Sequence, residues 1–123
     1  MEKFGNGNVR TKIPNGERGW IFGNFKENPL PFPWNYKDFE IKWADLKKGE
    51  NSGGVKNDTI DTVTITVLVK GGPHKTTLYP GESNEVAYVL EKEGDFVFWG
   101  PGVPHSWEAL EKNTTISFRY KVV

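Results

Sequence analysis

The sequence contains no cysteine, and this absence removes several kinds of chemistry at once. A chain without thiols forms no disulfide, no thiolate nucleophile and no cysteine-based metal site. The chain also lacks an excess of one charge, because 16 Lys and Arg residues balance 16 Asp and Glu residues. We therefore expect no binding to nucleic acid or to a membrane surface by general electrostatic attraction.

Long apolar segments are missing as well. Residues 1–12 lack the apolar stretch of a signal peptide, and no run approaches the roughly 20 residues that span a bilayer. These features predict a cytoplasmic protein with no membrane segment. No segment shows convincing helical periodicity, and 123 residues fit one domain with a single hydrophobic core.

The chain is instead a series of short β-type segments separated by Gly, Pro and Asn. The clearest runs from Asp61 to Val69, where Val and Ile hold the odd positions and Thr holds positions 62, 64 and 66. A period of two is typical of a strand, and we assign the apolar odd positions to the interior. About eight such strands at even spacing predict an all-β fold, an antiparallel barrel or double-sheet jelly roll. They are expected near residues 18–26, 38–46, 61–69, 74–79, 84–91, 96–99, 105–110 and 114–122.

The remaining segments are predicted to be an arm and two loops. Residues 1–17 are polar and rich in Gly and Asn, so we expect a flexible arm or edge strand before a barrel domain at 18–123. Such an arm can add a strand to a neighbour's exposed edge, and a mutual exchange closes at two subunits, which predicts a homodimer. Residues 28–35 contain three prolines and are expected to form an extended loop, as are residues 47–58.

The segment from Gly94 to His105, GDFVFWGPGVPH, organises the candidate site. A short strand is followed by a Gly/Pro corner, and the histidine then begins the next strand, which directs an imidazole toward a barrel interior. This segment resembles the second signature motif of the cupins, with Gly94, Gly102 and His105 in register. Gly100 stands where the family has Pro, and Ala109 stands where Asn is common. The resemblance implies an antiparallel double-stranded β-helix, the jelly-roll (RmlC-like) barrel of the cupins.

The first cupin motif supplies two His and one Glu, which join the second-motif His around a divalent metal. One good register places this motif on Gly53, Thr59, Asp61, Ile65 and Gly72. The spacing is kept but the ligands are replaced, so the resemblance implies a degenerate metal site. His105 and Asp61 remain as candidate metal ligands, and two protein donors would hold a divalent ion only weakly.

The chain also resembles a group of small cupin-like proteins over residues 18–122. The matching segments are Lys42-Trp43, Lys48-Gly49-Glu50, and Gly94-Asp95 through His105-Ser106-Trp107. The block at residues 99–107, Trp-x-Pro-Gly-x-Pro-His-Ser-Trp, is specific, and the rest is weak. This resemblance implies a fold, and no established activity comes with it.

The candidate catalytic pair is His105 with Asp61. If the carboxylate faces the imidazole, it favours the charged ring, fixes its orientation and permits acid–base chemistry. The alternatives are a histidine buried for structural reasons and an aspartate that only ends a turn. His74 is expected at the barrel rim as a solvated or capping residue, and Glu108 is expected to point outward.

Surplus aromatic residues, five Trp and eight Phe, suggest that some rings line a pocket. Candidate ligand-binding residues are Thr59, Trp99, Trp107, Tyr88 and Trp43. We therefore predict a cupin-fold protein that binds a small, polar or sugar-like molecule. The alternatives are a cupin enzyme, an isomerase or epimerase or a weakly metal-dependent enzyme using His105 with Asp61, and a partner-binding module acting through residues 28–35.

Overall fold

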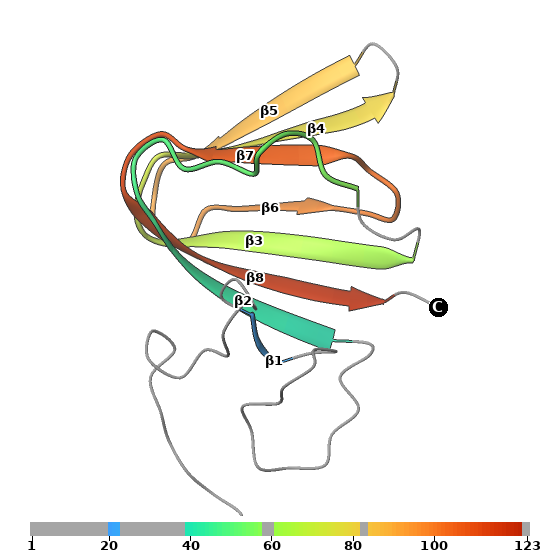
Figure 1. Cartoon of the computed structure of the whole chain (residues 1–123), viewed down its shortest axis with the longest axis horizontal. Coiled ribbons are helices and arrows are strands. Elements are labelled where there is room, and N and C mark those ends of the chain that lie inside the picture. Colours follow the sequence, from blue (N-terminus) through green and yellow to red (C-terminus); the bar gives the residue numbers. More distant parts are fainter. Residues whose placement is uncertain (1–19, 23–38, 58–60, 82–83, 122–123) are drawn as a thin grey trace, which may run out of the picture.

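The computed structural model describes residues 20–22, 39–57, 61–81 and 84–121, which form two antiparallel sheets (Figure 1). The strands in this part of the chain are β1 (Trp20–Phe22), β2 (Phe39–Leu46), β3 (Thr62–Gly71), β4 (His74–Gly81), β5 (Asn84–Leu90), β6 (Phe96–Trp99), β7 (His105–Ala109) and β8 (Asn113–Lys121). The larger sheet has the order β1-β2-β8-β3-β6, and the smaller sheet has the order β5-β4-β7. The all-β, antiparallel jelly-roll architecture predicted from the sequence is confirmed.

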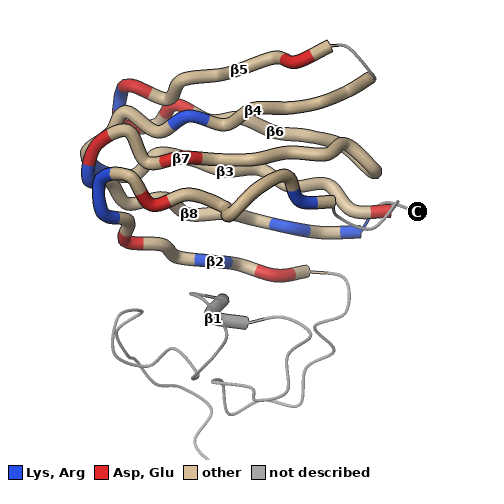
Figure 2. Tube along the Cα trace, turned by 45° about the horizontal axis from the view of Figure 1, so that its top comes forward, with Lys and Arg blue, Asp and Glu red and all other residues tan. Residues whose placement is uncertain are grey.

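Several predictions concern residues outside these described ranges. The arm at 1–17 and the proline-rich loop at 28–35 lie outside the described residues, and only β1 represents the strand expected at 18–26. Within the described ranges, no helix is long and apolar enough to cross a membrane. Basic and acidic residues are mixed along the trace in Figure 2, in keeping with the formal net charge of zero.

A tight turn connects β5 to β6 and starts the Gly94–His105 segment. The Asp95 carboxylate accepts hydrogen bonds from the backbone amides of Lys92 at 2.9 Å and Glu91 at 3.0 Å. These two bonds hold the pKa of Asp95 below its usual range. Gly94 adopts a φ of 95°, which an L side chain rarely tolerates. The Gly-Asp pair therefore favours this turn for local reasons.

The apolar core is small. It consists of Leu68, Leu90, Val97 and Trp99, with Leu78 and Val103 packed against them. Leu68 comes from β3, Leu90 ends β5, and Val97 and Trp99 come from β6, so the cluster joins the two sheets. Burying side chains of this size stabilises a fold by about 1.5–3 kcal/mol each.

The side chains of β3 alternate in the sense opposite to the prediction. Thr62, Thr64 and Thr66 are buried, whereas the Val and Ile residues between them are half-buried on the other side of the sheet. The assignment of the odd positions to the interior is therefore wrong. It assumed that the more apolar face of a strand always faces inward. In this barrel, a polar cavity occupies part of the interior, and Thr64 and Thr66 line it.

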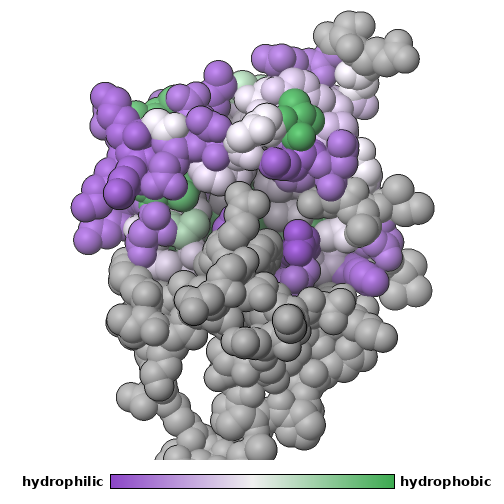
Figure 3. All heavy atoms as spheres, in the orientation of Figure 1, coloured by the Kyte–Doolittle hydropathy of each residue, from purple (hydrophilic) through white to green (hydrophobic). Residues whose placement is uncertain are grey.

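The apolar side chains of the larger sheet consequently share its outside. The strand register places them in three cross-strand rows: Phe39, Tyr120 and Val63; Ile41, Phe118, Ile65 and Phe98; and Trp43, Ile116, Val67 and Phe96. We call these eleven residues the outer apolar face. Its most exposed members are Phe96, 61% exposed, and Phe98, 63% exposed, both on the edge strand β6. On the side of the molecule seen in Figure 3, by contrast, hydrophilic residues predominate among those coloured.

Candidate functional site

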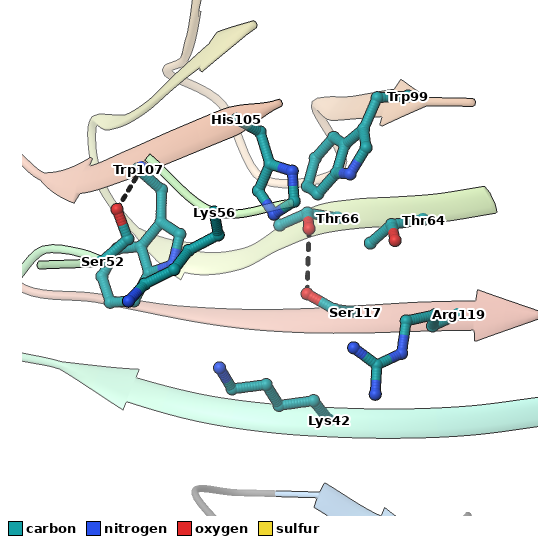
Figure 4. A pocket seen from close by; sticks show the side chains of 10 residues that line it. All are labelled: Lys42, Ser52, Lys56, Thr64, Thr66, Trp99, His105, Trp107, Ser117 and Arg119. Atoms are coloured by element: carbon teal, nitrogen blue, oxygen red, sulfur yellow. Dashed lines mark hydrogen bonds between the residues drawn. The ribbon is translucent and has the colours of Figure 1, made fainter. Parts of the chain in front are cut away.

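A cavity of about 200 Å³ lies inside the barrel. Its lining residues come from both sheets and from the segment between β2 and β3: Lys42, Ser52, Lys56, Thr64, Thr66, Trp99, His105, Trp107, Ser117 and Arg119 (Figure 4). We call it the His105 cavity. A smaller chamber of about 30 Å³ adjoins it and shares Lys42, Thr66, Trp99, Trp107 and Ser117. This chamber has room for one or two water molecules.

His105 is the first residue of β7 and is 7% exposed. Its Nδ1 lies 3.2 Å from the backbone oxygen of Val103, and because a carbonyl oxygen can only accept, Nδ1 carries a proton. The ring also packs on Trp99, with ring centroids 4.5 Å apart. These contacts fix the imidazole and leave Nε2 as the ring atom that can meet a ligand. The prediction that the Gly/Pro corner directs this ring inward is confirmed.

The segment between β2 and β3 runs along β7 and closes one wall of the cavity (Figure 1). Lys56 and His105 exchange two backbone hydrogen bonds, and the Ser52 amide donates to the Trp107 carbonyl at 3.0 Å. Ser52 Oγ also accepts from the Trp107 amide at 3.2 Å and donates to the Gly54 carbonyl at 2.7 Å. The expectation of a plain loop at 47–58 therefore missed this edge pairing, which brings Ser52 and Lys56 to the cavity.

Hydroxyl groups form one wall of the cavity. Thr64 and Thr66 come from β3, and Ser117 comes from the adjacent strand β8. Thr66 Oγ1 and Ser117 Oγ are hydrogen-bonded at 2.9 Å. Figure 4 shows His105 directed toward these hydroxyls from the opposite sheet. A polar ligand would thus meet a ring nitrogen on one side and hydroxyl groups on the other.

Within the described part of the chain, the charged residues that line the cavity are all basic: Lys42, Lys56 and Arg119. Arg119 donates from Nε to Glu40 Oε1 at 2.8 Å, and its Nη2 lies 2.7 Å from the same oxygen. This ion pair holds the guanidinium in one orientation at the cavity wall. Lys42 Nζ lies 5.9 Å from the ring centroid of Trp107, within reach of a cation–π interaction.

His74, expected at the rim, is instead 2% exposed and lines the inner chamber. Its ring stacks on Trp107, with centroids 5.7 Å apart and an interplanar angle of 23°. Burial lowers the pKa of His74 to about 4; the nearby Asn113 side chain raises it, and the charge of Lys42 lowers it further. Among the described residues, neither the buried His74 Nδ1 nor the buried Asn113 Oδ1 has a well-formed hydrogen bond, although Asn113 is close enough to affect the pKa of His74. The prediction of a solvated or capping histidine is therefore wrong.

The structure brings together only some of the predicted site residues. Trp99 and Trp107 line the cavity with His105, and Glu108 points outward as expected. Tyr88 lies on β5, is 49% exposed and does not line the His105 cavity. Trp43 belongs to the outer apolar face, where its Nε1 donates to Asp45 at 3.3 Å.

Asp61 does not accompany His105 in this cavity. Its carboxylate accepts a hydrogen bond from Thr62 at 3.4 Å and lies 3.9 Å from Lys121 Nζ. Because Thr62 is directed inward on β3, its neighbour Asp61 has the parity of the outer apolar face. Thr59 lies outside the described residues. The sequence reasoning missed Lys42, Arg119, Thr64 and Thr66, because it assigned the inner face of the large sheet wrongly. It missed Lys56 because it expected a plain loop there.

The lining of the cavity does not fit the divalent metal implied by the cupin resemblance. In the described part of the chain, no three His, Cys, Asp or Glu residues lie close enough to hold a metal ion. Around His105 stand hydroxyl groups, which are weak neutral donors, and three basic side chains, which repel a cation. This set of side chains is therefore unsuited to binding a divalent metal.

These features define a class of protein: two antiparallel sheets enclosing a cavity, with the motif histidine inside, form a cupin-type barrel. Solved structures with the same fold include the conserved SPY1581 protein of unknown function from Streptococcus pyogenes, with 23% identity, a TM-score of 0.55, and coverage of 71% of this chain and 68% of that one. They include the cupin domain of CENP-C from Drosophila melanogaster, with 17% identity, a TM-score of 0.55, and coverage of 84% and 68%. A third is an RmlC-like cupin from Shewanella frigidimarina, with 18% identity, a TM-score of 0.55, and coverage of 72% and 70%.

These similarities establish the fold, and the chain has the barrel of the cupins. No protein-family model matches the sequence, and no curated protein matches it either. A fold alone does not define a function, so the cavity is the feature of this chain that bears on it.

Proposed function

We propose that this protein binds a small polar molecule in the His105 cavity. The observation that supports this is a hollow inside the barrel with a polar lining, where a protein of this size would ordinarily pack its core. Buried polar groups normally find hydrogen-bond partners in the protein or in solvent, and a ligand with several polar atoms can take the place of that solvent.

The cavity suits a compact ligand. Its volume of about 200 Å³ lies below the roughly 300–1,000 Å³ typical of sites for drug-sized molecules. Trp99 and Trp107 supply flat apolar area, and the hydroxyl wall supplies donors and acceptors. This combination favours a molecule about the size of a monosaccharide, with one apolar face and polar edges.

Tryptophan fluorescence tests the proposal directly, because two of the five Trp residues line the cavity. We expect small polyols, sugars or organic acids that bind to change the emission, and His105→Ala and Trp107→Ala to weaken binding by about tenfold or more. Tyr88→Ala is the matched control, since Tyr88 is exposed and lies outside this cavity. Equal affinity in all three variants would exclude the His105 cavity as the binding site.

An enzyme is the second candidate, and the orientation of His105 is the observation in its favour. Because Nδ1 is used by the Val103 carbonyl, Nε2 is positioned to exchange a proton with a bound molecule. Asp61 is not placed to assist it, so the imidazole would act without the predicted carboxylate. A His105→Gln variant that keeps ligand affinity but stops turnover would favour the enzyme, whereas binding without any turnover favours the binding protein.

We also infer that the chain forms a homodimer through the outer apolar face. Contiguous apolar surface that continues to an exposed sheet edge is typical of an interaction site, and Phe96 and Phe98 extend this face to the edge strand β6. A second copy is the proposed occupant, because the face can meet itself around a two-fold axis and because a net charge of zero leaves no overall repulsion between copies. The arm at 1–17, which the sequence suggested for this role, lies outside the described residues.

A further inference from the structure

The positive charge of the His105 cavity indicates what kind of ligand it takes. Among the described residues that line it, the charged members are Lys42, Lys56 and Arg119, and none of these described lining residues carries a carboxylate. These cations reach the cavity from three different places: β2, the segment along β7, and β8. Figure 4 shows the side chains of Lys42 and Arg119 directed toward the same space from below His105.

We propose that the ligand is a small organic anion that carries hydroxyl groups, and a hydroxylated carboxylate is the simplest example. This inference rests on the small-molecule function proposed above.

Side-chain contacts hold two of the three cations, Arg119 and Lys42, and backbone pairing holds the main chain of the third, Lys56. Arg119 is anchored by Glu40, whose Oε1 contacts both Nε and Nη2 within 2.8 Å. Lys42 lies over the ring of Trp107, which itself stacks on the buried His74. The backbone of Lys56 is paired with that of His105 at 2.7 and 2.9 Å. Such preorganisation lowers the cost of binding a charged group, because little side-chain freedom remains to be lost.

The surroundings make the charges of Lys42 and Arg119, which are half-buried, more effective than that of an exposed lysine such as Lys56. The cavity is bounded by the buried Trp99 and His105, which keep solvent away from part of its wall. Electrostatic interactions strengthen where water is excluded. In the inner chamber the charge of Lys42 also lowers the pKa of His74, after the larger effect of burial. A carboxylate in the His105 cavity would therefore meet a favourable field as well as hydrogen-bond donors.

The hydroxyl wall completes the specificity. Thr64, Thr66 and Ser117 can donate to or accept from ligand hydroxyl groups, and His105 Nε2 faces them across the cavity. A bare inorganic anion would satisfy the cations and leave this wall unused. A neutral polyol would use the wall and leave the cations without an anionic partner from the ligand. Only a molecule with both features uses the whole lining.

This mode of binding also needs no bound metal. Lys42, Lys56 and Arg119 provide positive charge directly, at a site whose neutral hydroxyl donors are unsuited to a divalent cation. Anion binding should therefore survive treatment with a chelator.

The test compares matched probes on the full chain after chelation with EDTA and dialysis. We would titrate three pairs of acid and neutral counterpart, D-gluconate with D-gluconamide, D-glucuronate with D-glucose, and D-glycerate with glycerol, together with inorganic phosphate, using Trp fluorescence and calorimetry. We expect at least one hydroxylated carboxylate to bind about tenfold or more tightly than its neutral counterpart and than phosphate. Its affinity should fall as salt is raised from about 0.01 to 0.15 M, because salt screens the cations.

Charge variants separate the outcomes. Lys42→Gln and Lys56→Gln should each remove most of the preference for the acid, Lys42→Arg should retain it, and Lys70→Gln, on an exposed part of β3, is the matched control. If a neutral counterpart binds as tightly as its acid, the anion inference is overturned while the small-molecule proposal stands. Tightest binding by phosphate also overturns it, because the hydroxyl wall then plays no part. If neither acids nor neutral counterparts bind, both proposals fall.

Discussion

Lys56 and His105 lie opposite each other as an antiparallel pair, although the 48 residues 57–104 separate them in the sequence. The Lys56 amide donates to the His105 carbonyl at 2.7 Å, and the His105 amide donates to the Lys56 carbonyl at 2.9 Å. The pairing extends β7 sideways by the segment 49–56 and sets a basic side chain beside the motif histidine. The composition of the cavity thus depends on a segment with no strand-like sequence pattern.

Ser52 is expected to stabilise this pairing. Its Oγ accepts from the Trp107 amide and donates to the Gly54 carbonyl, and the residue is buried. Ser52→Ala leaves the amide without its side-chain acceptor, so we expect a loss of about 1–2 kcal/mol in the free energy of unfolding, measured by urea denaturation. Ser106→Ala, which removes one hydroxyl contact to Tyr79 at 3.1 Å, should cost less. A larger loss in Ser106→Ala would contradict this role for Ser52.

His74 predicts a specific dependence of stability on pH. Its pKa is about 4 in the folded protein, chiefly because of burial, and about 6.5 when unfolded. Between these values the unfolded chain binds more protons, so stability falls as the pH is lowered from about 6.5 to 4, by about 3 kcal/mol in total. Urea denaturation at several pH values measures this loss.

The matched variant is His74→Phe, which keeps a ring against Trp107 and has no group to titrate. It should flatten the pH dependence between 6.5 and 4. Asp95 affects stability in a separate pH range. Backbone hydrogen bonds lower its pKa from the ordinary value of 3.8, so its contribution to stability is fully present above pH 3.8 and is lost only below that pH. An unchanged slope in His74→Phe would show that another group is responsible.

The sequence allowed the β-architecture and the place of His105 to be predicted, because period-two segments and a Gly/Pro corner are local signals. It did not allow the inner face of the large sheet to be chosen correctly. On β3 a Thr face alternates with a Val/Ile face, and only the three-dimensional structure shows that Thr64 and Thr66 line a cavity. The same inversion hid Lys42 and Arg119, which face inward beside apolar neighbours that face outward.

Other parts of the site depend on contacts between residues far apart in the chain. His74 follows a Gly-Gly-Pro turn and resembles a rim residue in sequence, yet its ring is buried in the inner chamber against Trp107. The segment 49–56 contains Gly and Asn, which indicate a loop, and its pairing with β7 has no local signature. Register and burial of this kind are properties of the folded chain, so residue types alone do not reveal them.

Phe98 provides the test of the proposed homodimer. It is 63% exposed on the outer apolar face, and Phe98→Asp would introduce two charges into an isologous contact. Two lost Phe contacts of about 1.5–3 kcal/mol each should weaken the dimer more than about a hundredfold. Sedimentation at micromolar concentration measures this, with Tyr88→Asp on β5 as the exposed aromatic control. A wild-type monomer, or a dimer that only Tyr88→Asp disrupts, would refute the proposed interface.

Two glycines with nearly the same backbone conformation separate strain from steric crowding. Gly71 has a φ of 75° and Gly53 a φ of 74°, so an alanine at either position is strained by about 1–2 kcal/mol. At Gly53 an added Cβ meets nothing within 4 Å, whereas at Gly71 it would lie against the Lys112 carbonyl oxygen and 3.1 Å from Asn113 Cα. Because those atoms belong to the backbone beside β8, they cannot move aside without disturbing the β3–β8 pairing.

We therefore expect Gly71→Ala to lower the free energy of unfolding by about 1–3 kcal/mol more than Gly53→Ala, as measured by urea denaturation. Equal losses in the two variants would mean that the close approach at Gly71 relaxes without cost.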